Sequence, residues 1–335
     1  MNARWLILTI TASLAFGTPL FAQAPKAPPT PALPAVGGSS GNIIPVSYSN
    51  EQVAATVNGE KIFVGDIRKL LDRQPYPLSL TEAQKKEIRS TVLDSLVEDA
   101  LMRHYLAKNV PQVSQTDFNK AVAELQEALK KLNKTYEAFL KEEGQSEEQL
   151  RRDIIARLQW KNILLRMLPD DKAKAYYDAN KIFFDKVEVR ASHIMIQLPD
   201  NASKEQRDAA AQKLLVLRQE IAAGKATFED LAKQHSDCVV SKGKGGDIGK
   251  FPYKFIVYPE FSSAAFAMKV GDISGVVTTA KGVHLIKVTE RTPGVASNFE
   301  LIKEAVREIW AQDENLIPRI LAEQRKLGDI RVSLQ

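Results

Sequence analysis

The sequence has few of the residues that build disulfide-linked or metal-stabilised proteins: one cysteine and four histidines among 335 residues. The lone Cys238 cannot form an internal disulfide, and without closely spaced cysteines or histidines no structural zinc site is expected. Neither sign of charge dominates, since 46 Lys and Arg residues stand against 41 Asp and Glu residues. This balance argues against nucleic acid as a partner and indicates an ordinary soluble globular protein.

Long hydrophobic runs are also scarce, and the one candidate stands at the N-terminus. Arg4 precedes the apolar stretch Trp5–Phe16, which is too short to cross a bilayer of about 30 Å. Small residues follow, so the pattern is typical of a secretory signal peptide over residues 1–22, cleaved between Ala22 and Gln23. An uncleaved anchor is the alternative. We expect an extracytoplasmic or periplasmic protein with no membrane span after cleavage.

Residues 23–51 are rich in proline and glycine, which favours an extended linker. Order is then predicted to begin with strand Val53–Val57 and a hairpin turn at Asn58-Gly59. Helices follow, because Ser or Thr stands three residues before Gln or Asp, ahead of apolar residues at helical spacing. We therefore predict a helical, chaperone-like N-terminal domain over residues 52–184. The predicted helix starts are Thr81, Ser114 and Ser146.

The pattern changes at Val187, where strand-like and helical segments begin to alternate. Strand patterns over 187–198, 271–277 and 282–289 surround several short helices. This order predicts an α+β domain with a small antiparallel sheet over residues 187–291.

From residue 292 the pattern is helical again. Ser297 and Glu300 form a predicted capping pair, an apolar stripe runs from Phe299 to Ile320, and Pro318 should bend or divide the helix. An apolar stripe must be buried, so we expect the C-terminal helix, residues 292–335, to pack on the N-terminal domain. The predicted fold class is multidomain: a mainly α N-terminal domain completed by the C-terminal helix, plus the α+β domain.

Two histidines stand in strand patterns inside the predicted α+β domain. His193 and His284 each have apolar neighbours, so their side chains should point into the sheet or onto the floor of a pocket. Taken singly, such a histidine is more often a core residue than a catalytic one. The loop Ser236–Phe251 lies between them, and its glycines permit close approach of the backbone to a ligand. The loop lacks the Lys-Ser/Thr ending of a phosphate-binding loop.

Several short pieces of this domain occur together in one known family. They are Ala191–Ile194, Phe228–Ala232, Ser236–Phe251, Pro259–Phe261, Ala264–Phe266, Gly271–Gly275 and Gly282–His284. With these pieces in order, the segment resembles the parvulin domain of peptidyl-prolyl cis/trans isomerases. More loosely, the whole layout resembles the SurA/PrsA and PpiC-type exported foldases. Their helical chaperone region opens with a Val-Asn-Gly element, as at Val57-Asn58-Gly59 here.

The resemblance implies isomerisation of X–Pro bonds in unfolded or partly folded exported polypeptides, with no cofactor and no metal. Rotation about such a bond faces a barrier of about 18–20 kcal/mol. An apolar pocket that desolvates the amide should favour the twisted form, which has less charge separation. By resemblance, the polar catalytic residues are His193, Cys238, Thr279 and His284. The residues that bind the substrate are Ile248, Phe251, Val257 and Phe261.

Some features favour other interpretations. Val257 stands where the family often has Met, which favours a chaperone or client-binding module with weak isomerase activity. A cysteine hydrolase built on Cys238 is a further alternative, although the motif order argues against it. The segment Gln197–Arg207 lacks the arginine cluster of phosphate-specific members, so a preference for phosphorylated Ser/Thr–Pro is not supported.

Overall fold

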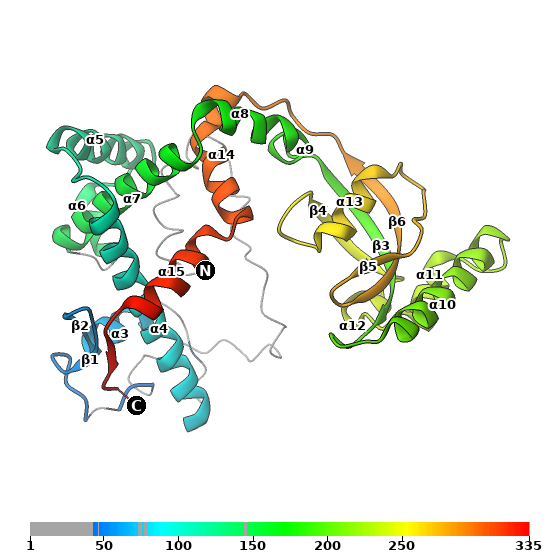
Figure 1. Ribbon diagram of the computed structural model, residues 1–335, viewed down its shortest axis with the longest axis horizontal. Helices are drawn as coiled ribbons and strands as arrows, with labels where there is room; N and C mark the ends of the chain where they lie inside the picture. The colour runs from blue at the N-terminus through cyan, green and yellow to red at the C-terminus, as the bar shows by residue number, and fades with distance from the viewer. Residues whose placement is uncertain (1–42, 46, 73–75, 77–79, 144–145, 335) are drawn as a thin grey trace. The chain divides into compact units, whose positions relative to one another are not determined.

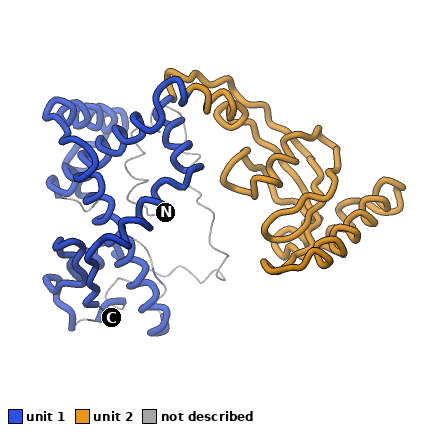
Figure 2. The backbone as a smooth tube through the Cα atoms, in the orientation of Figure 1, with its two compact units in different colours: residues 1–173, 303–335 blue, residues 174–302 orange. Residues whose placement is uncertain are grey.

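The computed structural model describes residues 43–334 except 46, 73–75, 77–79 and 144–145 (Figure 1). It divides into two compact units, coloured separately in Figure 2. Unit 1 comprises residues 1–173 and 303–335, and unit 2 comprises residues 174–302. Unit 2 is therefore inserted into the sequence of unit 1. The predicted signal peptide and its cleavage point lie outside the described residues.

A three-stranded sheet opens unit 1. Strand β1 (Val53–Val57) pairs antiparallel with β2 (Glu60–Phe63) and, on its other side, with β7 (Ile330–Val332). The predicted turn between β1 and β2 is present, with positive φ at both Asn58 and Gly59. Strand β7 was not predicted, because three residues carry no pattern of their own and are stabilised by pairing with a distant strand.

The segment before β1 is folded where it is described. Ile43 and Ile44 are each 1% exposed and join the core around β1 and helix α3 (Val64–Leu71). Arg68 of α3 donates hydrogen bonds to backbone carbonyl oxygens of this segment. The linker predicted over residues 23–51 therefore includes residues that are folded. The sequence did not indicate this, because an Ile-Ile pair followed by proline and serine has no helical or strand periodicity.

The predicted helix starts of unit 1 are confirmed. The side chains of Thr81, Ser114 and Ser146 each accept a hydrogen bond from the backbone three residues on. The helices of this region are α4 (Glu82–Asn109), α5 (Gln115–Lys131), α6 (Tyr136–Glu142) and α7 (Glu147–Met167).

The C-terminal helical region is divided, as Pro318 suggested. Helix α14 (Phe299–Asp313) ends before Asn315, which has a left-handed conformation with φ 48°, and α15 (Leu316–Leu327) follows. Pro318 lies in the first turn of α15, where a missing N–H costs little. Leu316 and Ile320 pack in one core cluster with residues of α4 and α7, chiefly Met102, Leu106 and Trp160. The predicted Ser297 cap is wrong: the Asn298 side chain accepts the Glu300 N–H instead.

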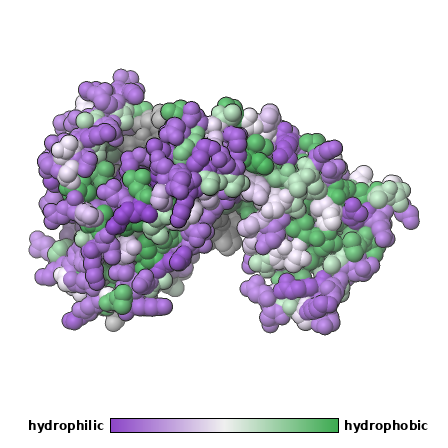
Figure 3. Space-filling model, turned by 45° about the horizontal axis from the view of Figure 1, so that its top comes forward, coloured by the Kyte–Doolittle hydropathy of each residue, from purple (hydrophilic) through white to green (hydrophobic). Residues whose placement is uncertain are grey.

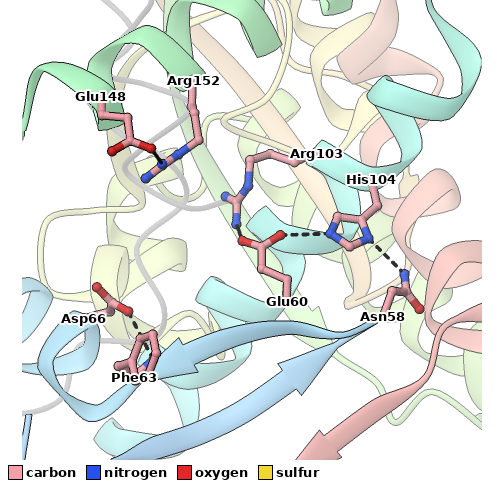
Figure 4. A network of polar contacts seen from close by, with 8 residues as sticks. All are labelled: Asn58, Glu60, Phe63, Asp66, Arg103, His104, Glu148 and Arg152. Atoms are coloured by element: carbon pink, nitrogen blue, oxygen red, sulfur yellow. Dashed lines mark hydrogen bonds and ion pairs between the residues drawn. The ribbon is translucent and has the colours of Figure 1, made fainter. Parts of the chain in front are cut away.

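A polar network joins the hairpin to α4 (Figure 4), and Asn58 links it to the approach to β7. Glu60 accepts hydrogen bonds from Arg103 at 2.6 Å and from His104 Nε2 at 2.8 Å. Asn58 contacts His104 Nδ1 at 3.2 Å and accepts the Asp329 N–H at 2.9 Å. Burial alone would raise the pKa of Glu60, but the Arg103 charge and these hydrogen bonds outweigh burial and hold it below its ordinary value.

Unit 2 is built around a four-stranded antiparallel sheet in the order β4-β3-β6-β5. Helices α10 and α11 share a core cluster with Ile194, Val283 and Leu285 of the sheet, whereas α13 shares one with Val189 and Ile286. Strand residues alternate between faces, so these helices cover opposite faces of the sheet. The strands are β3 (Glu188–Gln197), β4 (Asp247–Pro252), β5 (Val277–Thr279) and β6 (Gly282–Thr292). The helices are α8 (Asp170–Ala179, which crosses the division), α9 (Lys181–Phe184), α10 (Lys204–Ala222), α11 (Phe228–His235), α12 (Val239–Lys242) and α13 (Pro259–Ala267).

The two ends of unit 2 are tied to each other. The Asp185 carbonyl accepts the Val295 N–H at 2.7 Å, and the Asp185 carboxylate accepts the N–H and hydroxyl of Ser297 at 2.8 and 2.7 Å. Gly294 lies so close that a Cβ there would stand 2.1 Å from the Asp185 carbonyl oxygen. The chain therefore enters and leaves unit 2 at one place, where Asp185 is held against residues 294–297. We call these residues the neck of unit 2.

The fold class follows the prediction: a mainly helical region completed by C-terminal helices, plus an α+β unit with a small antiparallel sheet. Hydrophilic residues cover much of the face drawn in Figure 3, with hydrophobic residues in scattered patches. Among the described residues, no helix is both long enough and apolar enough to pass through a bilayer.

Candidate active site

The two histidines singled out in the sequence lie on the central strands of the unit 2 sheet. His193 is on β3, and His284 is on the neighbouring β6. Both side chains face α13, since the ring of Phe261 on that helix meets each imidazole edge-on, with centroids 5.7 and 5.6 Å apart. The sheet thus places two imidazoles side by side under one aromatic ring.

A chain of hydrogen bonds runs through these rings. His193 Nδ1 lies 3.2 Å from His284 Nδ1, and the rings stack with centroids 5.4 Å apart. His193 Nε2 lies 3.1 Å from the Ser241 hydroxyl, and His284 Nε2 lies 2.9 Å from the Thr279 hydroxyl. All four ring nitrogens therefore have a partner, and all four residues are buried.

Both histidines are neutral at physiological pH. Burial lowers the pKa of His193 to about 4, since an imidazolium ion loses its hydration there. Burial, reinforced by the neighbouring His193, lowers the pKa of His284 to about 4 as well. A neutral imidazole has one donor and one acceptor nitrogen, so at the 3.2 Å contact one Nδ1 must donate to the other.

An aromatic cluster forms the apolar side of the site. Phe261 is buried against the histidines, and Phe251 of β4 packs edge-on against it at 5.9 Å. Ile248 and Val257 are half-buried members of the same cluster. Phe251 is 1% exposed and Phe261 is 3% exposed, and the two rings support each other in the cluster.

The loop predicted over Ser236–Phe251 is more regular than expected, because it contains α12 and most of β4. Gly246 allows the loop to lie close against β3. Its φ is 86°, and its carbonyl accepts the His193 N–H at 2.9 Å. A Cβ at this position would lie 2.4 Å from the His193 carbonyl oxygen, so only glycine can be accommodated. The buried Ser236 hydroxyl accepts the N–H groups of Met195 and Cys238. The loop is thereby fixed along β3.

A family model described as a PPIC-type PPIASE domain matches residues 193–290, and one described as a SurA-like N-terminal domain matches residues 35–164. The chain is 42% identical to the peptidyl-prolyl cis-trans isomerase Pin1 of Malus domestica over 115 residues, which cover 30% of this chain and 93% of that protein. The chain belongs to the parvulin-type peptidyl-prolyl cis-trans isomerases.

A likeness to foldase proteins extends beyond unit 2. The foldase protein PrsA 2 of Bacillus cereus is 26% identical over 250 residues, covering 73% of this chain and 76% of that protein. A crystal structure of the peptidylprolyl isomerase PrsA from Bacillus anthracis covers 69% of this chain and 96% of that chain, at 25% identity and a TM-score of 0.40. The match to the isomerase domain and the likeness to the Bacillus cereus foldase support isomerase and chaperone function in one protein.

The structure brings most of the predicted parvulin site residues together. His193, His284 and Thr279 share the hydrogen-bond chain, and Phe251 and Phe261 share the aromatic cluster with Ile248 and Val257. Cys238 is half-exposed and stands at the start of α12, and its thiol makes no hydrogen bond to a described residue. Within the described ranges, no group of three or more His, Cys, Asp or Glu side chains could hold a metal ion.

One member of the network was missed. Ser241 is fully buried and completes the hydrogen bonding of His193, yet serines are common in loops and nothing in its neighbours marks it. The available signal was its position in the motif, three residues after Cys238 and five before Gly246.

Proposed function

We propose that this protein is an extracytoplasmic foldase whose parvulin domain isomerises X–Pro bonds in exported polypeptides. The observation that carries the proposal is the buried pair of neutral histidines, hydrogen-bonded at every ring nitrogen, beneath Phe261. Such an arrangement offers no charge and no free nucleophile. It suits a reaction in which no covalent bond is made or broken.

The apolar side of the site supplies the proline pocket in this proposal. Phe261 forms its wall, with Ile248 and Val257 beside it and Phe251 behind. A planar X–Pro amide is stabilised by charge separation that water solvates well. Removing water therefore raises the planar form in free energy more than the twisted transition state, and the barrier falls.

The histidine network supplies the polar side. Thr279 lies within 3.5 Å of the Gly282 carbonyl and receives the Lys281 N–H, which favours its hydroxyl donating to Gly282. Its oxygen then accepts from His284 Nε2–H, His284 Nδ1 accepts from His193, and His193 Nε2 accepts from Ser241. A network with one consistent direction holds both rings in place, so that the pocket floor is rigid.

Cys238 enters the proposal as a polar group facing the carbonyl of residue X, not as a nucleophile. A cysteine hydrolase needs a base within hydrogen-bond reach of the thiol. Both nitrogens of His193 and both of His284 are already engaged with other partners. The thiol makes no hydrogen bond to either ring, which favours the non-covalent role.

The rest of the chain supports a client-binding role in the same proposal. Residues 35–164 match the SurA-like N-terminal domain, and the foldase relative spans both units. Clients would be unfolded or partly folded exported polypeptides with X–Pro bonds. Export itself rests on the signal-like residues 1–22 and on these relatives.

A protease-coupled assay with a proline tetrapeptide tests the proposal on the full chain. We expect isomerisation well above the rate in buffer, and faster refolding of a protein whose slow step is proline isomerisation. A rate equal to buffer, with peptide binding retained, would leave only a client-binding module. Mass measurement of the exported protein tests the start of the mature chain, expected at Gln23.

A further inference from the structure

The loop between β4 and α13, residues 252–258, has an unusual backbone. We call it the pocket loop, because it carries the half-buried Val257 of the proposed proline pocket. Phe255 in its middle has φ 73°, a left-handed conformation that a bulky side chain rarely adopts. Among the described residues, the other non-glycine residues with positive φ are three asparagines and Lys186, and asparagine tolerates this region better. Contacts from outside the loop must therefore compensate for the conformational cost at Phe255.

The two ends of the pocket loop are tied to α13 and to the apolar cluster of the site. The Ser262 hydroxyl donates to the Tyr253 carbonyl, and the Ser262 N–H donates to the Tyr258 carbonyl at 2.9 Å. The side chains of Tyr253 and Val257 pack against the cluster that contains Phe261. The ends of the loop are thus fixed by the site itself.

The middle of the pocket loop is held by helices α8 and α9. The Phe255 ring meets Phe183 of α9 edge-on, with centroids 5.7 Å apart, and Phe183 is 8% exposed. The Lys254 ammonium lies 5.6 Å from the ring centre of Tyr176 on α8, within range of a cation–π contact. Phe183 also packs edge-on against Phe184 at 5.4 Å. The ring that receives Phe255 is therefore anchored in an aromatic cluster.

These two helices lie outside the residues that the isomerase family model matches. The match covers residues 193–290, whereas α9 ends at Phe184. Membership of the isomerase family therefore gives no role to Phe183. Its contact with the pocket loop nevertheless joins the segment before the matched domain to the proposed proline pocket.

We infer that Phe183 is a positioning residue of the isomerase site, which holds Phe255 and so keeps the pocket loop in the conformation that places Val257 at the proline pocket. The inference rests on the proposed function, in which Val257 lines that pocket. Successive Cα atoms are about 3.8 Å apart, and Val257 follows Phe255 by two residues. If Phe255 were released, its backbone would relax toward negative φ and redirect the chain that leads to Val257.

The test uses the full chain and a proline tetrapeptide. Phe183→Ala should raise KM about tenfold and change kcat less than about twofold, because the proline ring is bound alike in the planar and twisted forms. Phe183→Leu restores most of the apolar volume and should bring KM back to within about threefold of wild type. Phe255→Gly should raise KM about tenfold as well, since the ring contact is lost although glycine removes the strain.

A double-mutant cycle shows whether the two rings act as one contact. Phe183→Ala/Phe255→Gly should raise KM no more than either single variant, because each change already removes the same interaction. A rise of about a hundredfold in the double variant, the product of two independent effects, would overturn the inference.

Phe299→Ala is the matched control. Phe299 is 7% exposed and belongs to the same chain of ring contacts, but it packs against Tyr177, with centroids 5.6 Å apart. The control should lower the melting temperature of unit 2 to a similar extent as Phe183→Ala and leave KM unchanged. Thermal melts set an assay temperature at which all variants are folded. An equal rise of KM in the control, or no rise in Phe183→Ala, would refute the positioning role.

Hydrogen exchange separates this inference from the proposed function. In the absence of peptide, the amides of residues 253–258 should exchange at least about fivefold faster in Phe183→Ala than in wild type or Phe299→Ala. If wild type catalyses no peptide, the proposed function fails, but exchange still decides whether Phe183 orders the loop. Fluorescence anisotropy of a labelled proline peptide then decides whether that order serves binding. Unchanged exchange, or faster exchange with unchanged affinity, would contradict the inference.

Discussion

Unit 2 buries polar side chains, whereas unit 1 keeps nearly all of its polar groups at the surface. Of the eleven buried polar or charged residues among those described, eight lie in unit 2 and three in unit 1. Burying a polar group costs free energy unless the group is hydrogen-bonded. The concentration of buried polar residues in unit 2 therefore indicates a functional site in that unit. The four members of the histidine network account for half of the eight.

Arg307, one of the three buried polar residues of unit 1, has a different role. Arg307, 2% exposed, forms an ion pair with Asp170 and donates to the Leu168 carbonyl at 2.9 Å. Its contacts hold the end of α7 and the start of α8 against α14. In unit 1 the buried Arg307 joins segments that are distant in the sequence, whereas in unit 2 buried polar side chains form the histidine network.

The largest expected effect comes from cutting the chain after Glu314, which removes α15 and β7. Unit 1 would lose Leu316 and Ile320 from its core, and each such loss costs about 2–5 kcal/mol of a total near 5–15 kcal/mol. We expect calorimetry to show loss of the unit 1 transition, while unit 2 unfolds as before and tetrapeptide isomerisation persists. Leu327→Ser, at a position 72% exposed on α15, is the control and should change neither. Loss of isomerase activity in the cut chain would show that the units are not independent.

Matched core substitutions sharpen the comparison. Phe261→Ala should destabilise unit 2 by about 3–5 kcal/mol, and Leu106→Ala should destabilise unit 1 by about 2–5 kcal/mol. At a temperature where both variants are folded, we expect kcat/KM to fall at least about tenfold for Phe261→Ala and to stay near wild type for Leu106→Ala. Equal activity in the two variants would remove Phe261 from the proline pocket.

The pH dependence of stability should also differ between the units. His193 and His284 have folded pKa values of about 4, below the unfolded value near 6.5, so the unfolded state binds more protons between those pH values. Their stabilising contribution is present above pH 6.5 and is lost as pH falls toward 4, at up to about 1.4 kcal/mol per pH unit for each histidine. Denaturation of unit 2 measured from pH 8 to 4 checks this, with the exposed His235→Gln as control.

Isomerase activity should stay level from about pH 8 down to pH 5.5, because both histidines remain neutral over that range. A bell-shaped profile with a midpoint near pH 6.5 would contradict the neutral network and favour proton transfer.

A smaller loss of activity than at Phe261 is expected at Cys238. Cys238→Asp should keep measurable activity, since a carboxylate is also a polar group facing the carbonyl, and Cys238→Ala should lower kcat/KM further, by about fivefold, or about 1 kcal/mol. Thermal melts exclude misfolding. Complete and equal loss in both folded variants would support a covalent mechanism instead.

The elements of the fold that depend on residues close together in the sequence could be predicted. The caps at Thr81 and Ser146 are read from residues three apart, and the structure forms both. His193 and His284 could be paired only through motif order, because they are 91 residues apart in the sequence. Their roles, like those of Cys238 and Thr279, stay predictions until the variants are measured.

What could not be predicted depends on distant partners. β7 is three residues long and is ordered by pairing with β1, and the Asn58–Asp329 hydrogen bond spans 271 residues. Ile43 and Ile44 are buried by helices that follow them. Ser241 is placed by the fold of a loop whose glycines allow several conformations.

The tied neck of unit 2 bears on the order in which the protein folds. Unit 1 must bring β1 and β7 together across an insertion of about 130 residues. Once Asp185 holds Val295 and Ser297, about 110 of the roughly 270 residues between β1 and β7 no longer count as free chain, and the entropic cost of closing unit 1 falls by about 0.5 kcal/mol. A nascent molecule that emerges N-terminus first would complete its isomerase domain before the last residues of unit 1, including β7, were available to complete the core of unit 1.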